Sequence, residues 1–215
     1  MAKGKWQRAK VGVVLGALLV AHAGARAQRA GEPVVIGEKF EIQSKILKES
    51  RPLIIAKPAG YDKGTDRYPV LYLLDGDEHF HHTSGIVSFL ADSERIPGML
   101  VVAIPNTNRP RDLTPPSQAE LDVRFFPANG GADTFLRFLS DELMPYVEKN
   151  YRTRPYRILV GHSFGGLFAI HALTTRPEVF HAYIAIDPSL HWNNQALVSQ
   201  AEAFFGARTE LISMV

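Results

Sequence analysis

The sequence lacks cysteine altogether, although it runs to 215 residues. Disulfide bonds are therefore excluded, and so is a lipid anchor, which would need a cysteine just after an export signal. The fold must be held by its core alone, and the 46% of apolar residues is enough for one domain with a real core. A membrane-spanning run is missing too. The apolar stretch at residues 11–21 is about half of what a bilayer requires.

A strong excess of one charge is also missing. The formal net charge is +2, but five of the 24 basic residues and none of the 22 acidic residues lie in the first 27 positions. Residues 28–215 therefore carry 19 basic and 22 acidic side chains, a net charge of −3. The basic isoelectric point of about 8.8 is consequently no indication of nucleic acid or anionic lipid as a partner.

The chain begins with the layout of an export signal. Four basic side chains within the first ten residues precede the apolar stretch 11–21, and Ala25-Arg26-Ala27 places small residues at both cleavage-defining positions. This predicts a signal peptide over residues 1–27, cleaved before Gln28. We expect a periplasmic or secreted protein with one domain, residues 28–215, and no stable membrane anchor after cleavage. The competing interpretation, a membrane anchor, is disfavoured by the length of the stretch.

Strand-like and helix-like segments alternate along the rest of the chain. The first segment alternates in polarity and the second is expected to be its partner strand, whereas the next two strand-like segments are continuous apolar runs typical of buried parallel strands. The alternation that follows predicts an α/β fold, a mostly parallel sheet with helices on both faces. The expected strands are 39–47, 52–57, 70–74, 99–104, 156–160, 182–186 and the start of one at 211–215. The expected helices are 83–91, 132–151 with a bend or irregular turn at Pro145, 164–175 and 195–205. A long loop is expected at 107–129.

Ser163 lies where a predicted strand turns abruptly into a helix. The segment Gly161-His162-Ser163-Phe164-Gly165 matches G-x-S-x-G, in which a strained turn lifts the serine hydroxyl clear of the sheet. Side chains at positions 161 and 165 would collide with neighbouring backbone, which explains both glycines. The pattern predicts a catalytic nucleophile at Ser163. The plainer alternative is a tight turn that happens to contain a serine.

An acyl oxyanion formed at Ser163 would need two hydrogen-bond donors. The helix that starts at Phe164 points free N–H groups at that place, so the Phe164 N–H is the first candidate. The second usually comes from the loop after the third strand, here Asp75-Gly76-Asp77-Glu78. Gly76 lets the chain turn over the strand end, and the Asp77 N–H is the best-placed donor. The alternative for this loop is an ordinary acidic turn.

Two further groups of polar residues follow. His79, His81 and His82 lie close to acidic residues, but their spacing fits no strong metal signature, so we expect no metal. Arg109 and Arg111 could bind a substrate carboxylate or phenolate. They could equally pair with Asp112 or remain solvated.

The sequence resembles the putative-esterase group of α/β-hydrolases, which contains ferric-enterobactin and related siderophore esterases and S-formylglutathione hydrolases. The segments that carry the resemblance run from about Arg67 to Asn194; they are YPVLYLLDGDEHF, VVAIPNTNRPRDLTP, GGADTFLRFLSDELMPYVEKNYRT, YRILVGHSFGGLFAIHAL and YIAIDPSLHWNN.

The resemblance implies an α/β-hydrolase fold and hydrolysis of a small-molecule ester through an acyl-enzyme on Ser163. It also implies the N–H of Phe164 and an N–H of the Gly76–Asp77 turn as oxyanion donors, with no metal or organic cofactor. One position departs from the family. His191 stands where an aromatic residue is usual, and we interpret it as part of an altered substrate-binding wall.

The acid and base of a triad are not evident. In this fold the nucleophile is followed by an Asp or Glu and then by a histidine, each after a later strand. Only 52 residues follow Ser163, and none after His191 is a histidine. We therefore expect the acid and base beyond residue 215, with the fold cut off before its last strand and helix. The alternative is local compensation, with Asp187 as acid and His191 or His162 as base.

These observations favour an exported serine esterase, with siderophore-type esters as one candidate substrate class. Whether the 215-residue chain is active depends on the missing acid and base. A non-catalytic binding protein that keeps the hydrolase shell is a second hypothesis. An acyltransferase, which passes the acyl group to an alcohol instead of water, is a third.

Overall fold

The computed structural model of the protein describes residues 31–207. The predicted signal peptide and the predicted strand at 211–215 lie outside the described residues. Contacts divide the chain into a segment that ends at Val34 and a unit that starts at Val35, and the helices and strands found within residues 31–207 belong to the latter. None of the helices within residues 31–207 has the length and apolar character needed to cross a bilayer.

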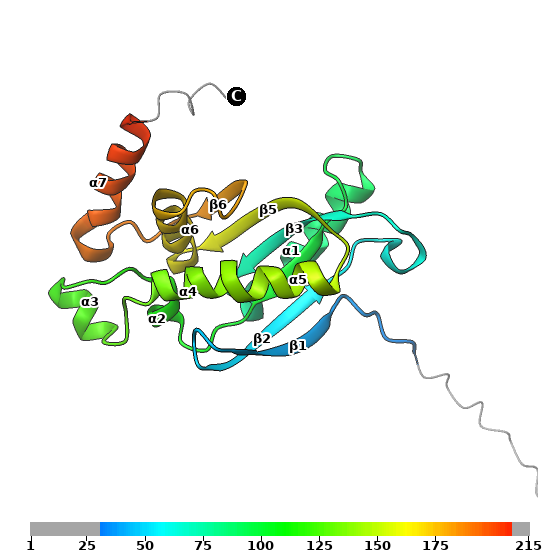
Figure 1. Cartoon of the computed structure of the whole chain (residues 1–215), viewed down its shortest axis with the longest axis horizontal. Helices are drawn as coiled ribbons and strands as arrows, with labels where there is room; N and C mark the ends of the chain where they lie inside the picture. The colour runs from blue at the N-terminus through cyan, green and yellow to red at the C-terminus, as the bar shows by residue number, and fades with distance from the viewer. Residues whose placement is uncertain (1–30, 208–215) are drawn as a thin grey trace, which may run out of the picture. The chain divides into compact units, whose positions relative to one another are not determined.

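A six-stranded sheet forms the centre of this unit (Figure 1). Its strands are β1 (Glu38–Ser44), β2 (Glu49–Ala56), β3 (Tyr68–Leu74), β4 (Leu100–Ile104), β5 (Thr153–His162) and β6 (Ala182–Ile186), in the spatial order β1-β2-β4-β3-β5-β6. The pairs β1–β2 and β2–β4 are antiparallel, and the pairs β4–β3, β3–β5 and β5–β6 are parallel. The predicted mostly parallel α/β fold is confirmed.

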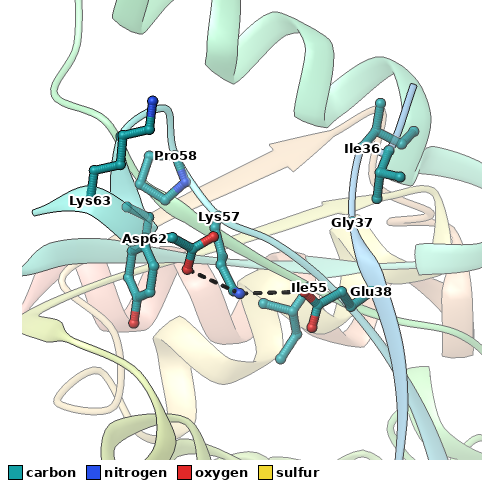
Figure 2. A pocket seen from close by; sticks show the side chains of 11 residues that line it. Ile36, Gly37, Glu38, Ile55, Lys57, Pro58, Asp62 and Lys63 are labelled. Carbon is teal, nitrogen blue, oxygen red and sulfur yellow. Dashed lines mark hydrogen bonds and ion pairs between the residues drawn. The ribbon is translucent and has the colours of Figure 1, made fainter. Parts of the chain in front are cut away.

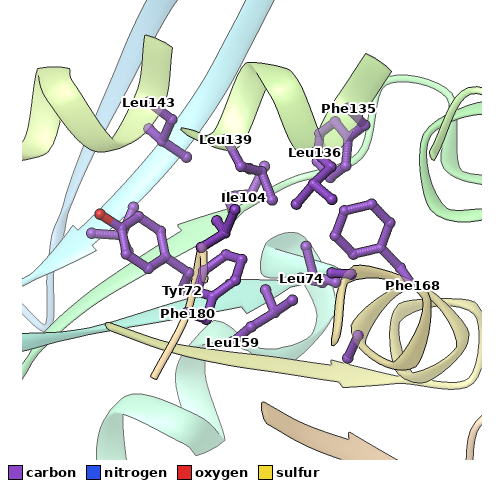
Figure 3. Packing of buried hydrophobic residues seen from close by; sticks show 14 of the residues in the cluster. Tyr72, Leu74, Ile104, Phe135, Leu136, Leu139, Leu143, Leu159, Phe168 and Phe180 are labelled. Atoms are coloured by element: carbon purple, nitrogen blue, oxygen red, sulfur yellow. The ribbon is translucent and has the colours of Figure 1, made fainter. Parts of the chain in front are cut away.

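Helices cover both faces of the sheet. They are α1 (Gly76–Asp92), α2 (Arg109–Leu113), α3 (Glu120–Phe125), α4 (Ala132–Phe138), α5 (Met144–Asn150), α6 (Phe164–Thr175) and α7 (Trp192–Gly206), with a 3-10 turn η1 (Tyr61–Lys63) and a π-helical segment η2 (Leu139–Leu143). Figure 3 shows Leu136, Leu139 and Leu143 pointing from the α4–η2–α5 helix toward sheet residues such as Ile104 and Leu159. On the other face, Phe80 and Val87 of α1 pack in a second cluster of buried apolar residues.

The central strands explain why two layers of helix are needed. Successive side chains of a strand point to opposite faces. In β3, Tyr72 and Leu74 face the α4–η2–α5 layer, whereas Leu71 and Leu73 face α1. All four are at most 6% exposed, because both faces of the strand are covered. The continuous apolar run in the sequence is the direct result.

Two predicted segments, one helix and one loop, differ clearly from the structure. The helix expected at 83–91 begins at Gly76, because the left-handed conformation of Asp75 (φ 52°, ψ 45°) turns the chain from β3 straight into α1. Its polar first turn has no apolar periodicity to reveal it. The loop expected at 107–129 contains α2 and α3, which are five and six residues long and too short to show a helical period.

One irregular feature, a bend or irregular turn at Pro145, was predicted and is confirmed. The long helix expected at 132–151 changes to a π-helical turn at η2 just before Pro145, whose ring nitrogen cannot donate to the preceding turn. In α7, residues Asn193, Asn194 and Gln195 have φ of 47°, 53° and 64°, so the regular helix starts after Gln195.

A buried ion network ties β2 to the loop and helix that follow β4. Arg51 of β2 is 1% exposed and donates to Asp112 of α2 at 2.7 Å and to Glu49 at 2.9 Å. Arg111 donates to Glu49 at 2.8 and 3.0 Å and to Asp112 at 2.6 Å. The hydrogen bonds from Arg111 are the main reason why the pKa of Glu49 is lowered to about 2. The network fixes where the chain turns after β4.

We predict that Glu49→Gln destabilises the fold in a pH-dependent way. The folded-state pKa of Glu49 lies below its ordinary value of 4.5, so its stabilising effect is fully present above pH 4.5 and is lost as the pH falls toward 2. At pH 7 the variant should lose about 1–2 kcal/mol of unfolding free energy, allowing for the partial exposure of the carboxylate. Urea unfolding at a series of pH values between 7 and 3 would measure this.

The matched control is Glu41→Gln, an exposed β1 glutamate that accepts a hydrogen bond from Ser50. It should change the unfolding free energy little at any pH. A destabilisation by Glu49→Gln that is as large at pH 3 as at pH 7 would contradict the electrostatic explanation.

Candidate active site

Ser163 occupies the single residue between the end of β5 and the start of α6. Its φ of 56° and ψ of −114° are unusual for a residue with a side chain, so the turn is strained. Close packing enforces the bend. A Cβ on Gly161 would lie 2.2 Å from the carbonyl oxygen of Gly165, and a Cβ on Gly165 would lie 3.1 Å from a carboxylate oxygen of Asp75. Any side chain at position 161 would therefore open the turn.

The main chain holds Ser163 against the end of β6 and the segment that follows it. The Ser163 N–H donates to the carbonyl of Ile186 at 3.1 Å, and the Ser189 N–H donates to the carbonyl of Ser163 at 3.1 Å. The two hydroxyl oxygens of Ser163 and Ser189 lie 3.1 Å apart. Ser163 is partly exposed, so its hydroxyl is within reach of a ligand. Sequence reasoning missed Ser189, because nothing local marks a serine that contacts a residue 26 positions earlier.

The two predicted oxyanion donors belong to the first turns of two helices. Phe164 is the first residue of α6, and Gly76 and Asp77 begin α1. Both helices start at the carboxyl ends of neighbouring parallel strands, β5 and β3, so their positive ends lie at the same edge of the sheet. A Cβ on Gly76 would lie 2.6 Å from the Ile104 nitrogen, which explains the glycine at the start of α1.

A buried carboxylate anchors an arginine next to the turn. The side chain of Asp75 is fully buried and accepts hydrogen bonds from Arg109 at 2.6 and 3.0 Å and from Asn106 at 2.7 Å. The pKa of Arg109 is raised, chiefly by its hydrogen bond to Asp75. Arg109 also donates to the His162 carbonyl at 3.3 Å, and its guanidinium lies 5.2 Å from the Phe164 ring centre. One arginine of the predicted pair thus lies beside the nucleophile.

Arg111, the predicted substrate-binding arginine, lies elsewhere. The hydrogen bonds of its side chain run to Glu49, Asp112 and Thr107, within the ion network. Asp75 was missed as the anchor of Arg109 because the acidic residue and the arginine are 34 positions apart. The only local signal was an acidic residue directly after a buried strand.

Three aromatic rings form a wall beside Ser163. The ring centres of Phe126 and Phe164 lie 5.1 Å apart, those of Phe164 and Trp192 lie 5.3 Å apart, and those of Phe126 and Trp192 lie 5.9 Å apart. The Trp192 indole N–H donates to the carbonyl of Pro115 at 2.9 Å, which fixes the ring. His191, the predicted substrate contact, is exposed and directly precedes α7.

The histidines near the turn contact one another. The His79 ring centre lies 5.2 Å from that of His82 and 5.6 Å from that of His162. These rings help to line a groove of about 230 Å³ on the α1 side of the sheet. Among residues 31–207 no group of three or more histidine, aspartate or glutamate side chains is arranged to hold a metal ion.

No histidine is hydrogen-bonded to Ser163 in the part of the chain that the structure describes. Asp187, the predicted local acid, is exposed and has φ of 42°, and it makes no side-chain hydrogen bond to a histidine there. The Asp–His hydrogen bond found within residues 31–207 joins Asp133 to His171 at 2.7 Å. His171 is eight residues along α6 from Ser163, which is about 12 Å of helix, so this pair cannot reach the nucleophile.

A cavity of about 340 Å³ lies at the opposite end of the sheet. Figure 2 shows Lys57, Asp62 and Glu38 at this cavity, with the ammonium group 3.3 and 3.4 Å from the two carboxylates. Lys57 follows the end of β2, which runs antiparallel to β4, so the cavity lies at the amino ends of the parallel strands. Lys57 is thus paired with two carboxylates there, and the cavity is remote from Ser163.

Residues 44–207 match the model of a family described as "Putative esterase". The chain belongs to this family. The predicted resemblance to siderophore esterases is thereby confirmed.

Similar proteins include siderophore esterases from a bacterium and a fungus. The chain is 33% identical over 171 residues to ferri-bacillibactin esterase BesA from Bacillus subtilis, covering 72% of this chain and 57% of that protein. It is 37% identical over 157 residues to the siderophore triacetylfusarinine C esterase of Aspergillus fumigatus, covering 66% and 52%. The chain thus spans little more than half the length of these relatives.

Solved structures give the same result for the fold. The crystal structure of an IroE-like serine hydrolase from Shewanella oneidensis matches with a TM-score of 0.74 and 39% identity, covering 78% of this chain and 55% of that one. The siderophore hydrolase EstA from Aspergillus nidulans matches with a TM-score of 0.72 and 29% identity, covering 86% and 70%. The α/β-hydrolase assignment is therefore confirmed for most of the chain.

We predict that Gly161→Ala destabilises the protein strongly. The added methyl group would lie 2.2 Å from backbone oxygen, so β5 or α6 must shift. The expected cost is about 3 kcal/mol, or a melting temperature about 6–12 °C lower for a domain of this size. Thermal unfolding followed by circular dichroism would measure it.

Gly85→Ala is the matched control, because Gly85 lies in the exposed middle of α1 and an added Cβ meets nothing within 4 Å. It should leave the melting temperature unchanged or raise it slightly, since alanine favours helix by about 0.5–1 kcal/mol over glycine. Equal melting temperatures for Gly161→Ala and the unchanged chain would contradict the close-packed turn.

Proposed function

We propose that the protein is a serine esterase that hydrolyses siderophore-type esters through an acyl-enzyme on Ser163. The observation that carries the proposal is the strained turn that presents the Ser163 hydroxyl beside the amino end of α6. Membership of the esterase family supports the same reaction. The esterases of bacillibactin and triacetylfusarinine C among the relatives support the substrate class.

In the proposed reaction the Ser163 oxygen attacks the carbonyl carbon of the ester and its proton passes to a base. The carbonyl electrons move to oxygen, and the oxyanion receives hydrogen bonds from the Phe164 N–H and from an N–H at the start of α1, Gly76 or Asp77. The alcohol leaves with a proton, and water then releases the acid from Ser163. No histidine side chain within residues 31–207 is hydrogen-bonded to Ser163, so the assay below is made on the 215-residue chain as it stands.

Arg109 and the aromatic wall support a substrate with aromatic and anionic groups. The Arg109 side chain is 29% exposed, and its Nη1 makes no hydrogen bond within the described residues. That N–H group can therefore donate to a phenolate or carboxylate of a ligand. Of the three rings, Phe126 is partly exposed and can offer aromatic contact, whereas Phe164 and Trp192 are buried against it.

We predict that a fluorophosphonate probe labels Ser163 and that enterobactin, a cyclic triester, is hydrolysed. Intact mass would show one adduct on the unchanged chain and none on Ser163→Ala, and chromatography would show enterobactin hydrolysis by the unchanged chain that is lost in that variant. Ser84→Ala is the control, since the Ser84 hydroxyl only donates to the His81 carbonyl on α1, and labelling should persist.

The alternatives give different results in the same assay. A chain that is folded by circular dichroism yet shows neither adduct nor hydrolysis would support a non-catalytic binding protein. Formation of a new ester when an alcohol such as glycerol is added, in place of free acid, would support an acyltransferase.

We also propose that the protein is exported, on the basis of the charge and polarity pattern of residues 1–27. Expressed with its own amino terminus in a bacterium, it should appear in the periplasm or medium with Gln28 as its first residue, as determined by mass spectrometry. Ala27→Arg should block cleavage, because a small residue is required there. A cytoplasmic product that retains Met1 would contradict export.

A further inference from the structure

We propose that Ser189 is a positioning residue whose hydroxyl donates a hydrogen bond to the Ser163 oxygen and stabilises the negative charge that develops there. This inference rests on the proposed function, because it concerns the same nucleophile. The contact that carries it is the 3.1 Å separation of the two hydroxyl oxygens. No other side chain within the described residues is hydrogen-bonded to the Ser163 hydroxyl.

The position of Ser189 is set by main-chain hydrogen bonds. Its N–H donates to the Ser163 carbonyl, and its carbonyl accepts from the Trp192 N–H, both at 3.1 Å. The Ser163 N–H in turn donates to Ile186 at the end of β6. Two strands and the start of α7 therefore fix the backbone of Ser189 relative to the nucleophile. At 9% exposure, its hydroxyl is also shielded from bulk water.

The turn that delivers Ser189 is itself strained and tightly packed. Asp187 has φ of 42°, in the left-handed region, and the Leu190 N–H donates to the Pro188 carbonyl at 2.7 Å. A Cβ on Gly166 would lie 3.0 Å from both the Ile186 oxygen and the Pro188 Cα. The first turn of α6 is thus pressed against the 186–189 segment. Backbone strain such as that at Asp187 persists where the surrounding structure holds it, and here it positions the Ser189 hydroxyl next to Ser163.

Chemistry favours Ser189 as the donor. Ser163 must give up its own proton during attack, so a partner that only accepted from Ser163 would compete with the base. The Ser189 hydroxyl makes no other hydrogen bond within residues 31–207, and its proton is free to point at Ser163. A hydrogen bond to an oxygen that gains charge strengthens as the charge develops. The contact therefore assists attack more than substrate binding.

The absence of native cysteine permits a direct test without substrate. Ser163→Cys introduces the only thiol of the chain, and its ionisation can be followed by the rate of alkylation with iodoacetamide as a function of pH. Combining it with Ser189→Ala should raise the midpoint of that curve by about half a unit to one unit, since a donor to the thiolate is lost. Below the midpoint, alkylation should be about threefold to tenfold slower.

Two further variants make the result specific. Ser189→Thr keeps a hydroxyl and should restore the midpoint toward that of Ser163→Cys alone. Ser93→Ala removes a hydroxyl that donates to the Phe89 carbonyl at the far end of α1, and it should leave the midpoint unchanged. Equal midpoints with and without the Ser189 hydroxyl would overturn the inference.

A second measurement separates this inference from the proposed function. In the otherwise unchanged chain, Ser189→Ala should slow fluorophosphonate labelling of Ser163 at least threefold, and in hydrolysis it should lower kcat more than it raises KM. If the unchanged chain is not labelled at all, the proposed esterase fails, and the thiol midpoint still decides the role of Ser189. If the unchanged chain is labelled and Ser189→Ala is labelled at the same rate, the inference is overturned.

Discussion

The tight turn between β5 and α6 is the constraint on which the site depends. With no room for a Cβ at Gly161, the chain reverses within one residue, and Ser163 is forced to a positive φ. That conformation costs of order 1–3 kcal/mol and is sustained because the turn is bonded on both sides to the segment after β6. The same reversal starts α6 at once, so the hydroxyl and the positive end of the helix are presented together. Reactive group and charge stabilisation thus come from one backbone feature.

Two charge clusters of different character involve the segment that follows β4 along the chain, and only one of them reaches that turn. Arg51, Glu49, Arg111 and Asp112 form a closed network in which the charges satisfy one another, and its effect is to fix the chain after β4. The pair Asp75–Arg109 is open by comparison, because the carboxylate is buried whereas the guanidinium is partly exposed beside Phe164. Arg109 and Arg111 are separated only by Pro110, and nothing in the sequence distinguishes their roles. Their roles differ because the closed network holds α2 in an orientation that turns Arg109 toward the nucleophile.

Much of the fold and the nucleophile could be predicted because their signals are local. The apolar runs of β3 and β4 and the glycines around Ser163 each reflect a requirement of a few adjacent residues. Asp75, Phe126 and Ser189 could not be predicted, since each acts through a contact with a residue 26 to 38 positions away. The start of α1 was missed for a different reason. Its first turn is polar because it caps the sheet edge where the site lies, and a polar turn carries no helical period.

The turn also explains why its neighbouring histidine is not its base. Adjacent residues at the end of a strand point to opposite sides, so lifting the Ser163 hydroxyl clear of the sheet sends the His162 ring toward α1, where it meets His79. Proximity in sequence therefore works against contact. The hydrogen-bonded pair Asp133–His171 has the chemistry of a catalytic acid and base, but it lies about two helical turns from Ser163 and cannot reach it. A base for Ser163 must approach from the exposed side of the turn, whereas Ser189, whose hydroxyl contacts Ser163 within the described residues, is buried. Such an approach leaves the Ser189 contact in place, so the donor and the base can act on the same oxygen at once.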